Sequence, residues 1–168
     1  MTDLETRLRR CRLLFLDFDG VLTDDHVMVS ETGQESVICD RSDGLGLRLL
    51  REQTDVRVVI VSSEENYVVS ARARKLGVDC LQNQANKLEA VRAELARWGV
   101  VAAEACYVGN DVNDLECLRY VGVAVGVANA AAAIRPHLDH ITSKPGGHGA
   151  VRELCDWILR LKAGGEAA

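Results

Sequence analysis

The stretch "LLFLDFDGVLTDD", residues 13–25, places closely spaced carboxylates at the end of a short apolar run. The run Leu13–Phe18 predicts a buried strand that carries Asp17 and Asp19 to its end. Like charges this close repel each other, so a fold keeps them where a cation or a reaction offsets the repulsion. Gly20 follows and permits a tight turn. The stretch therefore predicts a functional site at one strand end.

Apolar runs alternate with helical patterns along the rest of the chain. Further strands are predicted in "VRVVIVSS", "VDCL", "ACYVG", "VGVAVGV" and "HIT", within residues 56–142. Amphipathic helices are predicted at 43–52, 65–76, 87–98, 113–119, 130–137 and about 150–162, with Asn129 as a cap for the fifth. This alternation predicts an α/β fold, a three-layer Rossmann-like parallel sheet covered by helices on both faces.

An early hairpin interrupts this pattern at about residues 26–40. Two short strands, "HVMVS" and "ESVIC", flank Glu31-Thr32-Gly33, a typical glycine turn. No linker or internal repeat divides the chain, so residues 1–168 are predicted to form a single domain. Only the hairpin separates the first strand from the next helix, which leaves no room for a separate cap domain.

Composition excludes several classes of function. The net charge of −5 argues against nucleic acid as the main partner, because phosphate backbones favour a basic face. The six cysteines show no CxxC spacing and suit free thiols in a reducing compartment. No apolar run is long enough for a membrane span, and the first twelve residues lack a signal core. A cytoplasmic location without membrane contact is expected.

Polar side chains follow the predicted strands where parallel strands end together. Asp17 and Asp19 follow the first strand, Ser62 follows the second, Lys87 opens a later helix, and "GNDVND" at residues 109–114 follows another strand. Oxygen ligands from the aspartates and this loop suit Mg²⁺, while a hydroxyl and an ammonium suit phosphoryl oxygens. One carboxylate could attack phosphorus and the other could transfer protons. The set predicts phosphoryl transfer.

These motifs resemble those of the haloacid dehalogenase superfamily of phosphatases. "DFDGVLT" matches its first motif, DxDGxxT, and Ser62, Lys87 and "GNDVND" match the other three in order. The resemblance covers nearly the whole chain. It implies that Asp17 is the nucleophile of an aspartyl-phosphate mechanism and that Asp19 is the general acid and base. It also implies that Ser62 and Lys87 bind the phosphoryl group.

The resemblance also implies a Mg²⁺ site with one departure from the family pattern. Asp17 and the backbone carbonyl of Asp19 would ligate the metal, and Asp114 would orient the metal site. The family usually has aspartate directly after the glycine of the fourth motif, where this chain has Asn110. Asn110 supplies a neutral oxygen, so either Asn110 or the adjacent Asp111 is a candidate ligand.

Without a cap domain, the chain resembles the capless subgroup that hydrolyses octulosonate 8-phosphate or nononate 9-phosphate. That resemblance implies a homotetramer built by the hairpins and a phosphorylated sugar acid as substrate. The octulosonate type carries arginine where this chain has Glu64 and Ser42, whereas the nononate type is similar to this chain at both. Glu64 would then bind hydroxyls and Lys75 the substrate carboxylate. Arg152 is a candidate anion contact.

Each candidate also has a structural interpretation. Glu64 and Lys75 are more typical of an exposed helix pair than of substrate contacts, and only the resemblance favours a binding role. Ser63 is expected to cap the helix that follows it. A phospho-acceptor receiver domain is disfavoured because "VIVSS" offers no aspartate at the end of its strand. The alternative function is a non-catalytic oligomerisation module related to the C-terminal domain of acylneuraminate cytidylyltransferases. Asn110 favours this alternative, while the remaining catalytic set favours an enzyme.

Overall fold

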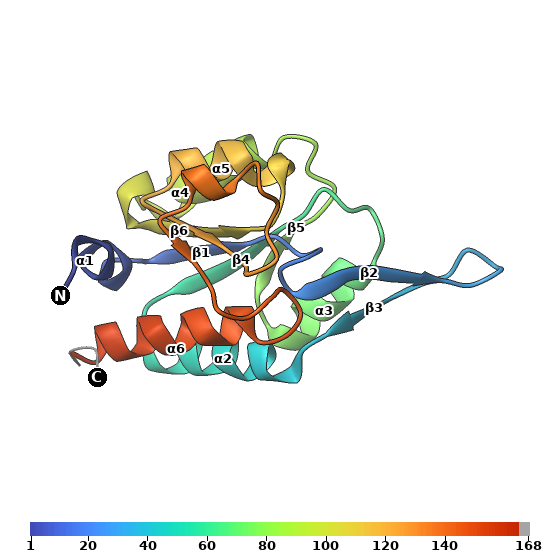
Figure 1. Ribbon diagram of the computed structural model, residues 1–168, viewed down its shortest axis with the longest axis horizontal. Coiled ribbons are helices and arrows are strands. Elements are labelled where there is room, and N and C mark those ends of the chain that lie inside the picture. Colours follow the sequence, from blue (N-terminus) through green and yellow to red (C-terminus); the bar gives the residue numbers. More distant parts are fainter. Residues whose placement is uncertain (165–168) are drawn as a thin grey trace.

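The computed structural model describes residues 1–164, and residues 165–168 of the predicted domain lie outside this range. Its centre is a six-stranded parallel sheet in the order β5-β4-β1-β6-β7-β8 (Figure 1). The strands are β1 (Leu13–Leu16), β4 (Arg57–Val61), β5 (Asp79–Leu81), β6 (Ala105–Gly109), β7 (Val123–Gly126) and β8 (His140–Ile141). Every residue of β1 is buried, as expected for a strand covered on both faces.

Helices cover both faces of the sheet and complete the predicted three layers. The helices are α1 (Asp3–Arg9), α2 (Arg41–Gln53), α3 (Val68–Leu76), α4 (Lys87–Trp98), α5 (Leu115–Tyr120) and α6 (Ala150–Lys162). In Figure 1, α4 and α5 lie above the sheet, and α2, α3 and α6 lie below it. No helix within residues 1–164 has the length and apolar character needed to cross a bilayer.

The order in which the chain adds strands to the sheet reverses at β1. In register, Leu14 lies between Val58 of β4 and Cys106 of β6. The chain builds outward from β1 on one side to β5 and on the other side to β8. Ligands of open parallel sheets bind beside the carboxyl ends of strands at such a switch point. Asp17 and Asp19 lie at this position, directly after β1.

The hairpin insertion forms a separate two-stranded sheet of β2 (Thr23–Val29) and β3 (Glu35–Cys39). It begins three residues earlier than predicted, because Thr23 pairs with Cys39 before a register shift that ends at Val27. Asp25 in this irregular stretch has a positive φ of 69°, a conformation that aspartate tolerates better than most residues. In Figure 1 the hairpin projects well beyond the body of the domain.

Two helix predictions were wrong in extent. The helix expected over 130–137 is only a short 3₁₀ turn, Arg135–His137, because Pro136 lacks an amide donor and disfavours helical backbone before it. Asn129 does not cap a helix there, since its Oδ1 accepts the Gly146 N–H at 3.0 Å.

The helix predicted from residue 65 begins at Val68 instead. The Asn66 Oδ1 accepts the Val68 N–H at 3.1 Å and holds the preceding residues in a turn. Ser63 lies in the irregular segment before that turn and not at the helix start, so its predicted capping role was wrong. The short helices α1 and 102–104 were also not predicted. The helix predicted over 113–119 begins as a 3₁₀ turn, Val112–Asp114, and continues as α5.

Candidate active site

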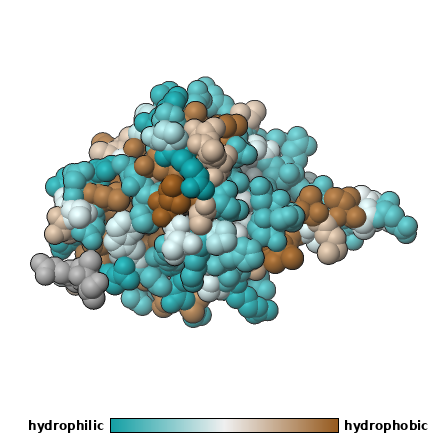
Figure 2. All heavy atoms as spheres, viewed as in Figure 1, coloured by the Kyte–Doolittle hydropathy of each residue, from teal (hydrophilic) through white to brown (hydrophobic). Residues whose placement is uncertain are grey.

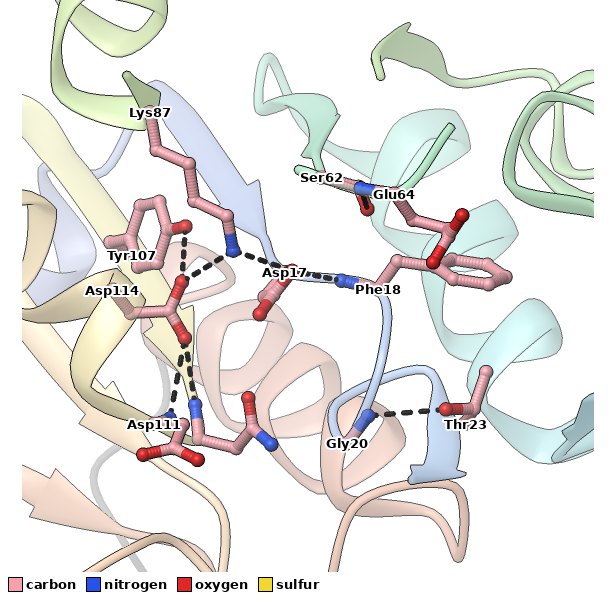
Figure 3. A network of polar contacts seen from close by, with 11 residues as sticks. Asp17, Phe18, Gly20, Thr23, Ser62, Glu64, Lys87, Tyr107, Asp111 and Asp114 are labelled. Carbon is pink, nitrogen blue, oxygen red and sulfur yellow. Dashed lines mark hydrogen bonds and ion pairs between the residues drawn. The ribbon is translucent and has the colours of Figure 1, made fainter. Parts of the chain in front are cut away.

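Asp17 and Asp19 follow β1 at the start of a tight turn. The N–H groups of Leu22 and Thr23 return to the Phe18 carbonyl, at 2.9 and 3.1 Å. The Gly20 N–H donates to the Thr23 Oγ1 at 3.1 Å, so the threonine of the first motif closes this turn (Figure 3). Asp17 is buried and Asp19 is half-buried. The turn therefore presents two carboxylates of different exposure at the sheet edge.

Lys87 lies between two buried carboxylates at the bottom of the site. Its Nζ is 2.8 Å from the Asp17 Oδ1 and 2.8 Å from the Asp114 Oδ1, as Figure 3 shows. Lys87 is the first residue of α4, where the helix dipole disfavours a cation. Two anionic partners offset that cost and the cost of burying the ammonium. The ordinary explanation, a solvated lysine at a helix start, is excluded.

These charges shift the pKa values of the groups that make up the site. Burial, followed by the nearby Asp114 charge, raises the pKa of Asp17 to about 8, although Lys87 acts in the opposite direction. Burial alone would lower the pKa of Lys87, but Asp17 and Asp114 raise it. One ammonium thus serves two carboxylates, and the site retains excess negative charge. A divalent cation beside Asp17 would offset that excess.

Asp114 organises the loop after β6 and uses both of its oxygens to do so. Its Oδ1 accepts the Tyr107 hydroxyl at 2.8 Å as well as Lys87, and its Oδ2 accepts the Asn110 N–H at 3.0 Å (Figure 3). A Cβ on Gly109 would lie 2.5 Å from this Oδ2, which explains the glycine. Because protein donors occupy both oxygens, Asp114 suits the orienting role better than direct ligation.

The two candidate metal ligands of this loop differ in exposure. Asn110 is buried, and its Nδ2 packs so closely on Gly20 that a Cβ there would be 1.9 Å away. Asp111 is exposed, and its Oδ1 accepts the Val112 N–H at 2.7 Å. Asn110 therefore lies against the Gly20–Thr23 turn, while Asp111 is exposed at the rim.

The donor set fits a hard cation that is held partly by neutral oxygens. Within residues 1–164, no three His, Cys, Asp or Glu side chains converge on a metal position. The Asp17 Oδ1 accepts both Lys87 and the Phe18 N–H, at 2.8 and 2.7 Å, which leaves its Oδ2 available. With the Asp19 carbonyl and the Asn110 amide, this oxygen suits octahedral Mg²⁺ that keeps several waters.

A cavity of about 190 Å³ connects these groups. It is lined by Asp17, Asp19, Asp25, Ser62, Ser63, Asn110, Asp111, Val112 and Asn113. The Ser62 hydroxyl accepts the Glu64 N–H at 3.0 Å and keeps its own hydrogen free to donate. Asp25, Ser63 and Asn113 were not predicted as site residues. The irregular stretch that places the exposed Asp25 beside the cavity leaves no pattern in the sequence.

The predicted substrate contacts lie outside this cavity in a single chain. Glu64 is close enough to Asp19 that, after burial, its charge raises the pKa of Asp19. However, the Glu64 Oε1 accepts the Glu65 and Asn66 N–H groups at 2.7 and 2.8 Å. Lys75 is exposed on the last turn of α3. Arg152 pairs with Asp156 at 2.8 Å and lines a different cavity beside His140 and Trp157.

Comparison with known proteins places this geometry in a family. A model of haloacid dehalogenase-like hydrolases matches residues 51–154. The 3-deoxy-D-manno-octulosonate 8-phosphate phosphatase of Escherichia coli (strain K12) is 35% identical over 158 residues, which are 94% of this chain and 84% of the relative. The chain belongs to the haloacid dehalogenase-like hydrolases. It is a phosphoric monoester hydrolase by family and by relatives.

Solved structures of capless members share the fold. The octulosonate 8-phosphate phosphatase from Moraxella catarrhalis, in complex with magnesium, phosphate and KDO, has a TM-score of 0.93 and 31% identity, and the match covers 97% of this chain and 94% of that one. The Yersinia pestis phosphatase has a TM-score of 0.92 and 33% identity, with 96% and 87% covered. The similarity therefore extends over nearly the whole of this chain and over most of both phosphatases.

Proposed function

We propose that this protein is a Mg²⁺-dependent phosphatase that hydrolyses a keto-sugar-acid phosphate through an aspartyl-phosphate intermediate. The observation that carries the proposal is Asp17, a buried carboxylate on the floor of the cavity with one oxygen held by Lys87 and the other free. Asp19 lines the same cavity two residues further on. A nucleophile and a proton donor thus face one space with a hydroxyl and an ammonium beside it.

In the first step, an Asp17 oxygen forms a bond to phosphorus as the bond from phosphorus to the sugar oxygen breaks. Asp19 gives its proton to the departing sugar oxygen. Lys87 and the Ser62 hydroxyl stabilise the charge that spreads over the phosphoryl oxygens. When bound, Mg²⁺ would neutralise part of this charge and hold the phosphoryl group beside Asp17.

In the second step, water attacks phosphorus, Asp19 accepts its proton, and the bond from phosphorus to Asp17 breaks. Inorganic phosphate leaves and both carboxylates return to their starting states. The turn between Gly20 and Thr23 keeps Asp19 close to both the leaving oxygen and the water in these steps.

The substrate class follows from the relatives and from the size of the cavity. The Escherichia coli relative described above is a 3-deoxy-D-manno-octulosonate 8-phosphate phosphatase. The cavity of about 190 Å³ suits a phosphoryl group, whereas pockets that enclose a whole ligand span about 300–1,000 Å³. The sugar acid therefore extends past the rim towards Glu64. Glu64 and Ser42 favour a nine-carbon acid over an eight-carbon one.

We propose that the protein assembles as a homotetramer through its hairpins. Figure 2 shows hydrophobic atoms on the projecting hairpin, where Met28 is 72% exposed and Ile38 is 62% exposed. Apolar side chains of this kind on an isolated ribbon mark an interaction surface. A neighbouring subunit would also close the open rim and bring cations such as Lys75 or Arg152 to the substrate carboxylate.

The test is phosphate release from eight- and nine-carbon sugar-acid phosphates with Mg²⁺ or with EDTA. We expect release that requires Mg²⁺ and disappears in Asp17→Asn, whereas Asp79→Asn, an exposed aspartate at the start of β5, retains it. A preference for nine carbons that Glu64→Arg reverses would support the role of Glu64. No release from a protein that still forms tetramers would reject the enzyme and favour the oligomerisation module.

A further inference from the structure

The backbone of the glycine loop, residues 145–149, packs directly against the backbone of the Gly20–Thr23 turn. The Gly147 N–H donates to the Val21 carbonyl at 3.0 Å. A Cβ on Gly146 would lie 1.7 Å from the Gly20 carbonyl oxygen, and a Cβ on Gly147 would lie 2.4 Å from the Asp24 nitrogen. No side chain larger than hydrogen fits between these two segments. The loop therefore sets how far the turn can move away from the sheet edge.

The Gly20–Thr23 turn also packs against the loop that follows β6. A Cβ on Gly20 would lie 1.9 Å from the Asn110 Nδ2. The glycine loop, the Gly20–Thr23 turn and Asn110 thus form three consecutive layers in contact. A displacement of the first layer passes to the second and changes the space between Asp19 and Asn110.

A buried aspartate outside the site anchors the glycine loop. Asp43, in the first turn of α2, is 0% exposed, and its Oδ1 accepts the Arg152 N–H at 2.8 Å. Gly149, the cap residue of α6, offers no side chain for the free N–H groups of that helix. Asp43 therefore caps α6 from a neighbouring helix. The cap holds the point at which the glycine loop enters α6.

The cost of this arrangement indicates that it does more than fill space. The Asp43 Oδ2 is buried without a hydrogen-bond partner, and a buried polar atom left unpaired lowers the stability of the fold. α2 and α6 also pack closely beside it, because a Cβ on Gly46 would lie 3.1 Å from the Arg152 Cα. An apolar residue would pack there without the unpaired oxygen but could not hold the first turn of α6.

We infer that Asp43 and Gly146 are positioning residues, which hold the Gly20–Thr23 turn against Asn110 and so set the geometry of the active site. This inference rests on the proposed phosphatase function. Neither residue lines the cavity, so they act through the turn and not on the substrate.

Three variants and a control test the inference. Gly146→Ala adds one methyl group at an ordinary φ and tests the steric contact alone. Asp43→Ala removes the cap of α6, while Asp43→Asn keeps an oxygen that accepts the Arg152 N–H. Gly99→Ala is the control for general destabilisation. Alanine strains the backbone at the φ of +60° of Gly99, but no atom lies within 4 Å of the added Cβ, so no neighbouring segment is displaced. The readouts are kcat and KM, calorimetric binding of Mg²⁺ with inorganic phosphate, and the amide NMR shifts of Gly20 and Asn110.

We expect Gly146→Ala to lower kcat by about 100-fold, the effect of misplacing reacting groups by about 1 Å. KM should change much less, and Mg²⁺ binding should weaken about tenfold, as for loss of a residue that supports a metal ligand. Asp43→Ala should act in the same direction and Asp43→Asn should restore both values. The amides of Gly20 and Asn110 should shift in Gly146→Ala and Asp43→Ala only.

The inference is overturned if Gly146→Ala and Asp43→Ala match Gly99→Ala in kcat and in these amide shifts. If Gly146→Ala does not fold, the comparison of Asp43→Ala with Asp43→Asn decides. If the wild type releases no phosphate, the proposed function fails by itself. The amide shifts of Gly20 and Asn110 in the Asp43 pair then decide whether the loop positions the turn.

Discussion

Lys87 shows how one residue combines structure and chemistry. Its ammonium neutralises Asp17 and Asp114, which lie on different loops, and so joins the ends of β1 and β6. The same ammonium faces the phosphoryl group in the proposed reaction. A salt bridge this deep is weak evidence of net stabilisation, but removal of one partner leaves buried charge uncompensated.

We predict that Lys87→Met lowers the free energy of unfolding by about 3–5 kcal/mol at pH 8 without metal. The loss should shrink as the pH falls below about 8, because Asp17, whose pKa is raised to about 8, then binds a proton and no longer needs the ammonium. Urea unfolding at several pH values measures this. Lys162→Met is the control, since Lys162 pairs at the surface with the exposed Asp55, and it should cost at most about 1 kcal/mol. Equal losses in both variants would contradict the prediction.

Asp43 predicts a pH dependence of stability. Burial raises the pKa of Asp43 to about 6 from an ordinary 3.8, with Asp40 adding to the rise and the α6 amides and Arg72 opposing it. Between these values the folded chain holds a proton that the unfolded chain has lost. Stability therefore falls as the pH rises from about 4 to about 6, by an amount on the order of 2 kcal/mol.

The measurement is the free energy of unfolding across that pH range for wild type and Asp43→Asn. The difference between the two proteins should change with pH in the direction stated, since the asparagine carries no titrating proton. A difference that stays constant from pH 4 to pH 7 would show that Asp43 titrates normally.

At the scale of elements, close helix contacts depend on glycine. α2 contains Gly44 and Gly46, although glycine inside a helix costs about 1 kcal/mol relative to alanine. A Cβ on Gly44 would meet the ends of the flexible side chains of Leu76 and Arg72. A Cβ on Gly46 would meet the Arg152 Cδ at 2.8 Å and also the Arg152 Cα at 3.1 Å. The ends of the Leu76 and Arg72 side chains can move away, but the Arg152 main chain cannot.

We predict opposite outcomes for the two alanine variants. Gly44→Ala should leave stability unchanged or raise it by up to about 1 kcal/mol, because helix propensity improves. Gly46→Ala should lower stability by about 1–3 kcal/mol through overpacking of α2 on α6. Thermal and urea unfolding of both variants check this. Similar effects of the two substitutions would contradict a rigid contact between α2 and α6.

At the scale of the whole molecule, the hairpin is the part that the domain itself does not bury. Its two strands expose apolar side chains on both faces: Val27 and Val29 on one, Met28 and Ile38 on the other. Exposed two-stranded ribbons are marginal in water and pair readily with other chains. Assembly would therefore bury the hairpin and cover the open rim of the active site together.

We predict that Met28→Lys combined with Ile38→Lys dissociates the assembly while the domain stays folded. Light scattering after size exclusion should report a smaller mass, and circular dichroism should report an unchanged fold. Val101→Lys is the control, because Val101 is 62% exposed, like Ile38, but lies away from the hairpin. A wild type that is monomeric, or a double variant that assembles normally, would contradict the prediction.

Much of the site could be predicted because its chemistry lies at the ends of strong local patterns. Apolar runs of strand length place Asp17, Ser62 and the loop after β6 at one edge of a parallel sheet wherever the chain alternates strand and helix. Lys87 could be assigned to the same edge as the first residue of a well-formed helix. These positions follow from periodicity and connection order, which a chain carries within short windows.

The sequence alone determined the α/β class, the hairpin insertion and the convergence of Asp17, Asp19, Ser62 and Lys87. Other features became visible only in the folded chain. Both oxygens of Asp114 accept protein donors, Asn129 binds Gly146 instead of capping a helix, and Lys75 and Arg152 lie away from the cavity. The same is true of Asp43, an ordinary polar residue in sequence that becomes a buried cap for a helix more than one hundred residues later. The physical reason is that hydrogen bonds and close packing between distant segments depend on where complete elements meet, and no local pattern records that meeting.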